Sequence, residues 1–366
     1  MKKTILTTAA LAVIIILASA SLKKEVGTQQ QNVPQNEFSN RIYTHKNLTI
    51  FLIQGKDELQ RKYLTLEEAM QQKKIILNET GSVGELSADN ISSEYVFIMA
   101  GDIVKGGRQD RTIGEDIVLA PGSKKIPLKS FCVEQSRWSG RGSESASVFS
   151  SSEKMLNNKA LKVAARTEKN QHKVWEEVSG YQTKISDRVQ SEVKSSASPS
   201  SLQLTLENDK LKNSITEYVN ALQPAFEGKK DVLGFAFFVN GKISTVETFG
   251  NADLFRKLQK KLLEAAASEA FEQYDEKLKF ETPILETLNT FIEMAGKGTE
   301  TVEQTSANMT EYTKKTEHSI LLRSVNTDAG KAALHTSIYS TEGLTLGENK
   351  FEYGGRQRNI NRMIRD

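Results

Sequence analysis

The residues best suited to chemistry lie in one segment, residues 96–138. It contains the run Gly106-Gly107-Arg108-Gln109-Asp110-Arg111, followed by Glu134, Arg137 and Trp138. Paired glycines let backbone N–H groups approach an anion closely, and an arginine guanidinium makes two parallel contacts with a phosphate or a carboxylate. The segment therefore predicts a site for an anionic group. Its ligand-binding residues would be Gly106, Gly107, Gln109, Arg111, Arg137 and Trp138.

Two acids in the same segment could do catalysis. Asp110 and Glu134 are placed to act as a general acid and base, or as ligands of a hard cation, if the fold brings them together. This pattern favours a hydrolase as the second functional hypothesis. A structural arrangement fits the same residues: the glycines would form a hairpin turn, and arginines would pair with Asp110 and Glu134 beneath Trp138.

Several familiar sites are absent from the sequence. It has no P-loop, no GxGxxG after a strand, no HExxH and no GxSxG motif. The four histidines are scattered singly, so no metal is indicated and each histidine is expected to be structural, although His335 could join a site through the fold. The sole cysteine, Cys132, lies in a strand-like context and is expected to be buried and unreactive. No cofactor can be named.

The first twenty residues have the pattern of a secretory signal. Lys2 and Lys3 precede an apolar run, which ends in the small residues Ala18-Ser19-Ala20. We expect cleavage near Ala20 and export to the periplasm or beyond. If the segment is kept, it would anchor the chain to a membrane. Residues 21–40 are polar and are expected to form a linker.

The charge balance argues against a nucleic-acid partner. The 49 basic and 46 acidic residues give a net charge of +3, and cleavage would remove two of the basic ones. Domains that bind nucleic acid usually carry a strongly basic face. Residues 341–366 form a basic tail with four arginines near its end, which is expected to be solvated. The partners that remain are an anionic small molecule or a protein of the cell envelope.

Local patterns predict an α+β fold. Strands are expected at 48–53, 75–77, 95–99, 117–119 and 128–133, a capped helix from Thr65, a loop at 139–152 and a helix over 153–182. The clearest unit is a hairpin at 232–248 around Asn240-Gly241, followed by an amphipathic helix. Residues 282–315 look mostly helical, and a last strand pair is expected at 319–325 and 332–339. We therefore predict one domain, residues 41–340, with an antiparallel sheet covered by helices.

Several ordered motifs resemble the bacterial and archaeal ARPP-1 family, named for its association with ARG and rhodanese-phosphatase-superfamily proteins. They are NLTIFLI, LTLEEAM, VFIMAGDIVKGGRQDR, FCVEQSRW, the Gln171/Trp175 helix and GFAFFVNGK with FGNADLFRKL. The resemblance implies a link with ADP-ribosylglycohydrolases and phosphatase-like proteins. It also implies that the cluster from Gly106 to Trp138, with Arg111, Glu134 and Arg137, is the functional one.

Three functions are compatible with these residues. The first is an exported binding or accessory domain that recognises a phosphorylated or nucleotide-like group. The second is a hydrolase acting on a phosphate- or ADP-ribose-containing substrate through Asp110 or Glu134. The third is a structural envelope protein without a small-molecule site.

Overall fold

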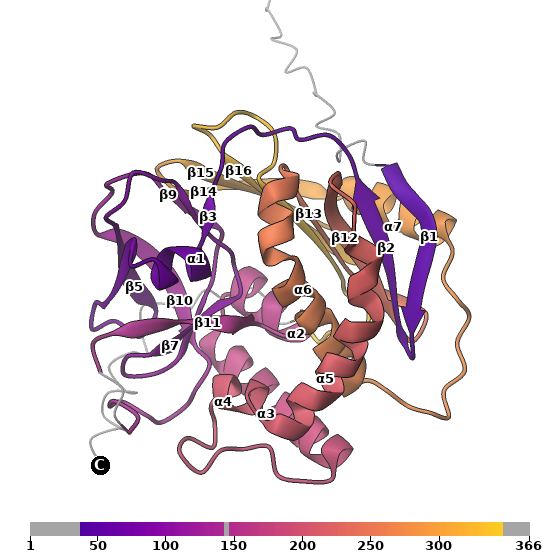
Figure 1. Cartoon of the computed structure of the whole chain (residues 1–366), viewed down its shortest axis with the longest axis horizontal. Helices are drawn as coiled ribbons and strands as arrows, with labels where there is room; N and C mark the ends of the chain where they lie inside the picture. Colours follow the sequence, from indigo (N-terminus) through magenta and orange to yellow (C-terminus); the bar gives the residue numbers. More distant parts are fainter. Residues whose placement is uncertain (1–36, 143–145, 347–366) are drawn as a thin grey trace, which may run out of the picture. The chain divides into compact units, whose positions relative to one another are not determined.

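The computed structural model describes residues 37–142 and 146–346, which belong to one structural unit (Figure 1). The predicted signal segment, most of the predicted linker and the tail from residue 347 onward lie outside the described residues. Export therefore stays a prediction. Within the described ranges, no helix has both the length and the apolar content needed to cross a bilayer.

The largest sheet has eight strands, and its neighbouring strands are all antiparallel. Its order is β1 (Glu37–His45), β2 (Leu48–Gln54), β12 (Val232–Val239), β13 (Lys242–Phe249), β17 (His335–Ser340), β16 (Ser319–Asn326), β15 (Met309–Lys315) and β14 (Thr299–Ser306). The sheet thus joins the start of the described chain to its middle and its end.

The hairpin of β12 and β13 lies inside the large sheet. Asn240 and Gly241 have φ angles of 52° and 76°, the left-handed values that a tight two-residue turn requires. Every residue of β12 is buried, because this strand lies inside the sheet between β2 and β13. The predicted hairpin is confirmed.

A second sheet has six strands and carries the Gly106-Gly107 turn. Its order is β11 (Phe149–Met155), β7 (Asp102–Gly106), β8 (Arg111–Ile113), β10 (Ile126–Cys132), β5 (Glu85–Asn90) and β4 (Ile75–Glu79). An isolated bridge between Asn78 and Val148 links its two outer edges, so the sheet curls around a core of its own that includes Leu77, Leu86 and Val104.

A third, small sheet consists of β3 (Leu64–Thr65), β6 (Val96–Ile98) and β9 (Ile117–Leu119). Here β3 and β6 are parallel, which departs from the antiparallel pairing expected throughout. The α+β class is confirmed, but the single sheet that the sequence predicted is corrected to three sheets. Strands from residues 95–133 are divided between the two smaller ones.

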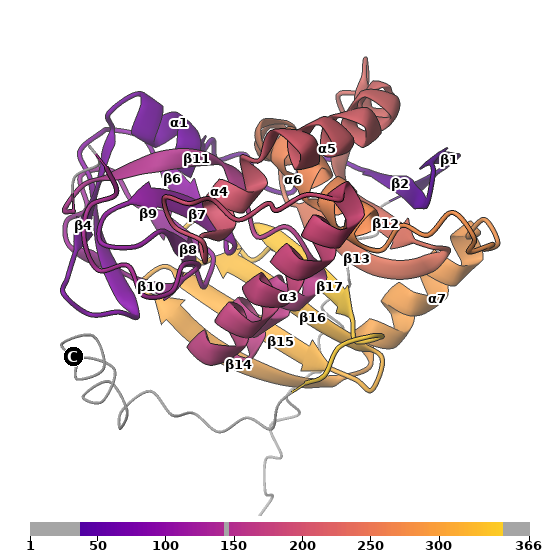
Figure 2. The ribbon, with the colours of Figure 1, turned by 90° about the horizontal axis from the view of Figure 1, so that it is seen from below.

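The helices join and cover these sheets (Figures 1 and 2). They are α1 (Leu66–Gln71), α2 (Lys159–Lys162), the π-helix η1 (Val163–Thr167), α3 (Gln171–Val189), α4 (Leu202–Leu206), α5 (Asp209–Leu222), the 3₁₀ helix η2 (Gln223–Phe226), α6 (Ala252–Glu272) and α7 (Leu285–Gly296). Thr65 and Glu68 form the predicted capping box of α1. Helix α6 packs on β12 and on α5, while α7 packs on β15 and β16.

The large sheet uses both of its faces. Leu48, Ile50 and Leu52 of β2 belong to the same buried cluster as the apolar residues of α3, α5 and α6. Phe51 points the other way, since side chains alternate along a strand, and its ring lies 5.4 Å from that of Phe238. This two-sided burial explains why residues 50–53 of β2 form an unbroken apolar run.

Residues 139–182 differ from the prediction of a loop followed by one helix. Strand β11 occupies residues 149–155 because it pairs with β7, and a second helix begins only after Asn170, whose side chain accepts hydrogen bonds from the backbone N–H groups of His172 and Lys173. The long helix is therefore α3, which starts at Gln171.

Residues 299–315 were also predicted wrongly as helical. They form β14 and β15, which pair with each other along their length. Strand β14 lies at the edge of the sheet and is exposed on both faces, so its sequence lacks the alternation by which a half-buried strand is recognised.

Candidate functional site

The fold brings together the residues that the sequence singled out. The run from Gly106 to Arg111 connects β7 to β8, while Glu134, Arg137 and Trp138 follow the adjacent strand β10. Residues 198–201, which lie far away in the sequence, complete the cluster. The predicted proximity is therefore correct, and the chemistry depends on how these groups are paired.

Both acids of the cluster are completely buried and paired with arginines. Asp110 accepts hydrogen bonds from Arg141 and from the hydroxyl of Ser201, each at 2.9 Å. Glu134 accepts two from Arg137, each at 2.7 Å, and another from Ser198. Burial alone would raise the pKa of Glu134, but the hydrogen bonds from Arg137 and Ser198 hold it below its usual value. Glu134 is therefore a buried anion with committed partners.

The backbone of the glycine pair is also occupied. The N–H of Gly106 donates to Asp110 at 2.9 Å, and the N–H of Gly107 donates to the carbonyl of Val148 at 3.1 Å. The carbonyl of Gly107 in turn accepts a hydrogen bond from Arg137 at 3.1 Å. These groups stabilise the turn and hold the neighbouring chain.

Arg111 lies beneath this network and is fully buried. Its nearest acid is Glu79, with 3.7 Å between Nη2 and Oε2, and it also contacts Cys132 and Gln109. The Trp138 ring lies 5.7 Å from the Arg111 guanidinium and 5.3 Å from that of Arg108. Arg111 therefore pairs with Glu79 and not with Glu134. The side-chain amide of Gln109 donates a 3.0 Å hydrogen bond to the backbone carbonyl of Glu134.

Cys132 and Trp175 lie beside this cluster. Burial raises the pKa of the Cys132 thiol to about 11, as expected of an unreactive core cysteine. The side-chain amide of Gln171 pairs with the backbone of Cys132 through two 2.8 Å hydrogen bonds, and the indole of Trp175 donates to the Glu134 carbonyl. Helix α3 is thereby fixed to β10. The contacts of the cluster thus resemble the structural arrangement, in which arginines pair with Asp110 and Glu134. The ligand-binding and catalytic roles of these residues stay predictions.

A second buried network was not foreseen. His335 lies between Asp116, 2.8 Å from its Nδ1, and Glu247, 2.9 Å from its Nε2. Arg166 pairs with Asp116 at 2.7 Å and with Glu311 at 2.9 Å. Burial alone would raise the pKa of Glu247, but Lys162 and His335 hold it at about 2. Asp116 and Arg166 likewise remain charged.

Ser337, His335 and Asp116 have the order of a nucleophilic triad, with 3.2 Å between the Ser337 hydroxyl and His335 Nε2. All three side chains are shielded from solvent. The Ser337 hydroxyl donates to Glu247 at 2.6 Å, so it is not free to be activated. This network connects Asp116, just before β9, to Glu247 of β13, Ser324 of β16, and His335 and Ser337 of β17. Its geometry is structural, and we call it the buried clamp.

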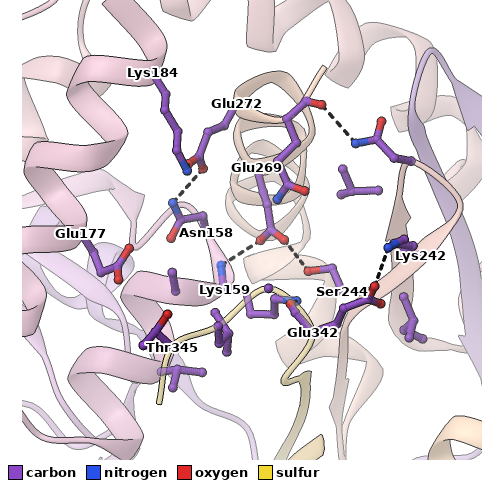
Figure 3. Close-up of a pocket in the computed structure, with 18 of the residues that line it drawn as sticks. Asn158, Lys159, Glu177, Lys184, Lys242, Ser244, Glu269, Glu272, Glu342 and Thr345 are labelled. Atoms are coloured by element: carbon purple, nitrogen blue, oxygen red, sulfur yellow. Dashed lines mark hydrogen bonds and ion pairs between the residues drawn. The ribbon is translucent and has the colours of Figure 1, made fainter. Parts of the chain in front are cut away.

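A cavity of about 780 Å³ offers a more accessible site (Figure 3). It is lined by the start of α2, one side of α3, the β12–β13 turn, the end of α6, residues 278–280 and residues 342–346. Its apolar wall includes Val239, Ile243, Phe280 and Leu344. Its charged residues are Lys159, Lys173, Lys184, Lys242, Lys279, Glu168, Glu177, Glu269, Glu272 and Glu342.

Glu269 forms part of the cavity wall and is almost fully buried. It accepts a 2.8 Å hydrogen bond from the backbone N–H of Lys159 and another from the Ser244 hydroxyl. Burial raises its pKa above the usual value, because removing a carboxylate from water costs more than these partners return. Glu272 is paired with Asn158 and Lys184, at 2.8 and 2.9 Å (Figure 3).

The lysines of the cavity differ in their partners. Lys184 lies 2.9 Å from Glu272, and Lys242 pairs with Glu342; both side chains are largely exposed. Half-buried Lys159 donates instead to the backbone carbonyl of Glu342 at 2.9 Å. Burial lowers the pKa of Lys159 because no carboxylate is close enough to offset the loss of hydration. Among the described residues, neither Lys159 nor Lys279 forms an ion pair.

Replacing Glu269 by glutamine is expected to remove one source of pH dependence. The pKa of Glu269 is higher in the folded state than its ordinary value of 4.5, so the folded state binds the proton more tightly than the unfolded state does. The contribution of Glu269 to stability therefore falls as the pH rises above 4.5. The free energy of unfolding of wild type, relative to Glu269→Gln, should therefore decrease from pH 4.5 upward. Urea unfolding at several pH values measures this difference. A constant difference would show that Glu269 is not perturbed.

Sequence reasoning missed this cavity because its lysines and glutamates resemble ordinary solvated helix faces. One signal was available: Glu269 lies in the run Ala265-Ala-Ala-Ser-Glu-Ala270, whose six consecutive residues are all buried, so that α6 is covered on every side there. An acid within such a run requires a special environment.

The described residues contain no group of three or more His, Cys, Asp or Glu side chains able to hold a metal ion.

Comparison with known families now adds to this geometry. The model of the ARG and Rhodanese-Phosphatase-superfamily-associated Protein domain, ARPP-1, matches residues 38–339. The chain belongs to the ARPP-1 family. No curated protein and no solved structure matches it. The ARPP-1 match includes the arginine cluster, the buried clamp and most of the cavity lining, but residues 342–346 on the cavity wall lie beyond it.

Proposed function

We propose that this ARPP-1 protein binds a small compound with an anionic group, a phosphate or a carboxylate, in the lysine-lined cavity. The observation that carries the proposal is the convergence of five lysines from four segments of the chain; two of these lysines have no carboxylate partner among the described residues. Lys159 is half-buried, and its Nζ donates to the backbone carbonyl of Glu342 and not to a carboxylate. The lysines of the cavity therefore keep cationic capacity for an anionic ligand.

The rim of the cavity can adapt to such a ligand. Lys184 and Lys242 are 63% and 68% exposed in their ion pairs. Exposed ion pairs contribute about 0–1 kcal/mol, so Lys242 can exchange the exposed Glu342 for a ligand at little cost. Lys184 can reach a ligand while it stays beside the buried Glu272. The apolar wall formed by Val239, Ile243 and Phe280 would contact the body of the ligand.

The other functions have less support in the geometry. A hydrolase based on Asp110 or Glu134 needs a carboxyl group within reach of substrate, yet both are buried and held by arginines. The structural envelope protein would be favoured by a cavity that binds nothing. Export after cleavage near Ala20 remains part of the proposal, and cell fractionation with N-terminal sequencing of the purified protein tests it.

Ligand binding should be visible as thermal stabilisation. A ligand present at about 100 times its dissociation constant, and bound only by the folded state, adds about 2.7 kcal/mol to the free energy of unfolding. The panel comprises inorganic phosphate, sugar phosphates, ADP-ribose, nucleotides and dicarboxylates. We expect stabilisation by at least one of them, and loss of that stabilisation in the double variant Lys184→Met/Lys242→Met.

Lys297→Met is the matched control. Lys297 is 67% exposed on α7 and pairs with Glu293, but it lies outside the cavity. This variant should keep the full ligand-induced shift. If no member of the panel stabilises the wild type, the structural hypothesis replaces the proposal. If stabilisation survives in the double variant but is lost in Arg137→Met, the ligand binds at the arginine cluster instead.

A further inference from the structure

We propose that Lys159 is a nucleophile that forms a reversible imine with a carbonyl group of the ligand. The ligand would then be an anionic carbonyl compound, such as an α-oxo acid or a phosphorylated aldehyde. This inference rests on the proposed function, because the anionic group must be held elsewhere in the same cavity, by Lys184 and Lys242 on the rim.

The position of Lys159 suits this role. It begins α2, directly after Asn158, whose side chain caps the helix by accepting a hydrogen bond from the backbone of Leu161. Its backbone N–H is fixed to Glu269, so the start of the side chain is held at the cavity wall. Its Nζ donates to the Glu342 carbonyl at 2.9 Å. A neutral amine can make this donation and still present its lone pair to a ligand.

The surroundings of Lys159 differ from those of the other cavity lysines. Lys173 and Lys184 lie 3.0 and 2.9 Å from Glu177 and Glu272, and these contacts help to raise the pKa of both lysines. Burial lowers the pKa of Lys159, while Glu269 of α6 and Glu342 oppose this shift only in part. A larger fraction of Lys159 is therefore unprotonated at neutral pH, and only that form attacks a carbonyl.

The reaction is a balanced condensation. The amine lone pair of Lys159 forms a bond to the carbonyl carbon, and the π-bond electrons move to the oxygen. The two amine protons are transferred to that oxygen, which leaves as water, and a C=N bond joins the ligand to Lys159. The step needs no oxidant or reductant.

Reductive trapping tests the inference. The full chain is incubated at neutral pH with glyoxylate, which has a carbonyl and a carboxylate, and the imine is reduced with borohydride. Peptide mass mapping then locates the secondary amine. We expect labelling of Lys159 to exceed that of Lys184 and Lys242 severalfold, because those two lysines are held in ion pairs, whereas Lys159 donates to a backbone carbonyl. Labelling should disappear from this peptide in Lys159→Met, and Lys297→Met should behave as wild type.

A second measurement covers the case in which Lys159→Met is poorly folded. In the wild type, the rates at which Lys159 and Lys184 react with trinitrobenzenesulfonate are followed against pH. The midpoint of the Lys159 profile should lie below that of Lys184. Equal labelling of all three lysines by glyoxylate overturns the inference. Glycolate has the same carboxylate without the carbonyl. If glycolate stabilises the chain but glyoxylate is not trapped, the imine is wrong and the binding function stands.

Discussion

Replacing Arg166 by methionine is expected to lower the free energy of unfolding by about 3–5 kcal/mol, the usual cost of breaking a buried ion pair by removing one partner. The Arg166 guanidinium contacts Asp116, Glu311, Ser324 and Ser337, and it is almost fully buried. Without it, two carboxylates in the interior lose their counter-charge. Urea unfolding followed by circular dichroism measures the loss.

Arg256→Met is the control for this variant. Arg256 pairs with Asp253 on the surface of α6 and is 60% exposed, so its loss should change stability by about 0.5 kcal/mol or less. A loss below about 1 kcal/mol for Arg166→Met would mean that the clamp is dispensable. In that case Asp116 and His335 would have to be reconsidered as functional groups.

Asp110→Asn is expected to cost about 3 kcal/mol in stability, because Arg137 and Arg141 both lose the Asp110 carboxylate in a buried site. The hydrogen bond that the Ser201 hydroxyl donates to the same carboxylate is weakened by the same substitution. Limited proteolysis should therefore cut residues 195–201 faster in the variant. The catalytic hypothesis predicts the opposite pattern, in which stability is kept and an activity is lost.

A double variant sharpens this test. Asp110→Asn/Arg141→Met removes both members of the pair, and it should recover part of the stability lost in Asp110→Asn, since the buried cation that faced the lost carboxylate is removed as well. Full stability in the single variant would contradict the structural account of Asp110. It would also restore interest in Asp110 and Glu134 as catalytic groups.

Local chemistry predicted the elements that depend on their own residues. The Asn240-Gly241 turn, the capping box at Thr65 and the apolar stripe of α6 each need only neighbours in the sequence, and each is present. Strand β11 was missed because it exists by pairing with β7, far earlier in the chain. Strand β14 pairs with the neighbouring β15, but it is an exposed edge strand without alternating burial. Their own side chains carry little of the signal.

The candidate site was predictable only in part, for a related reason. The residues between Gly106 and Trp138 are near one another in the sequence, so their clustering followed from the turns between strands. The cavity, in contrast, joins Lys159 to Glu269 and Glu342 through three different parts of the fold. Burial lowers the pKa of Lys159, and a single sequence does not show how deeply a lysine is buried.

The place of β2 in the large sheet has a consequence for how this protein is made. Strand β2 is fully apolar over most of its length, yet its inner partner β12 follows about 180 residues later in the chain. At a synthesis rate of about 5–20 residues per second, the ribosome needs roughly 10–40 s to produce that partner. During this time the LTIFLI segment has only β1 to pair with, and its other edge is open to aggregation. A chaperone that shields β2 should therefore increase the yield of folded protein more than faster translation does.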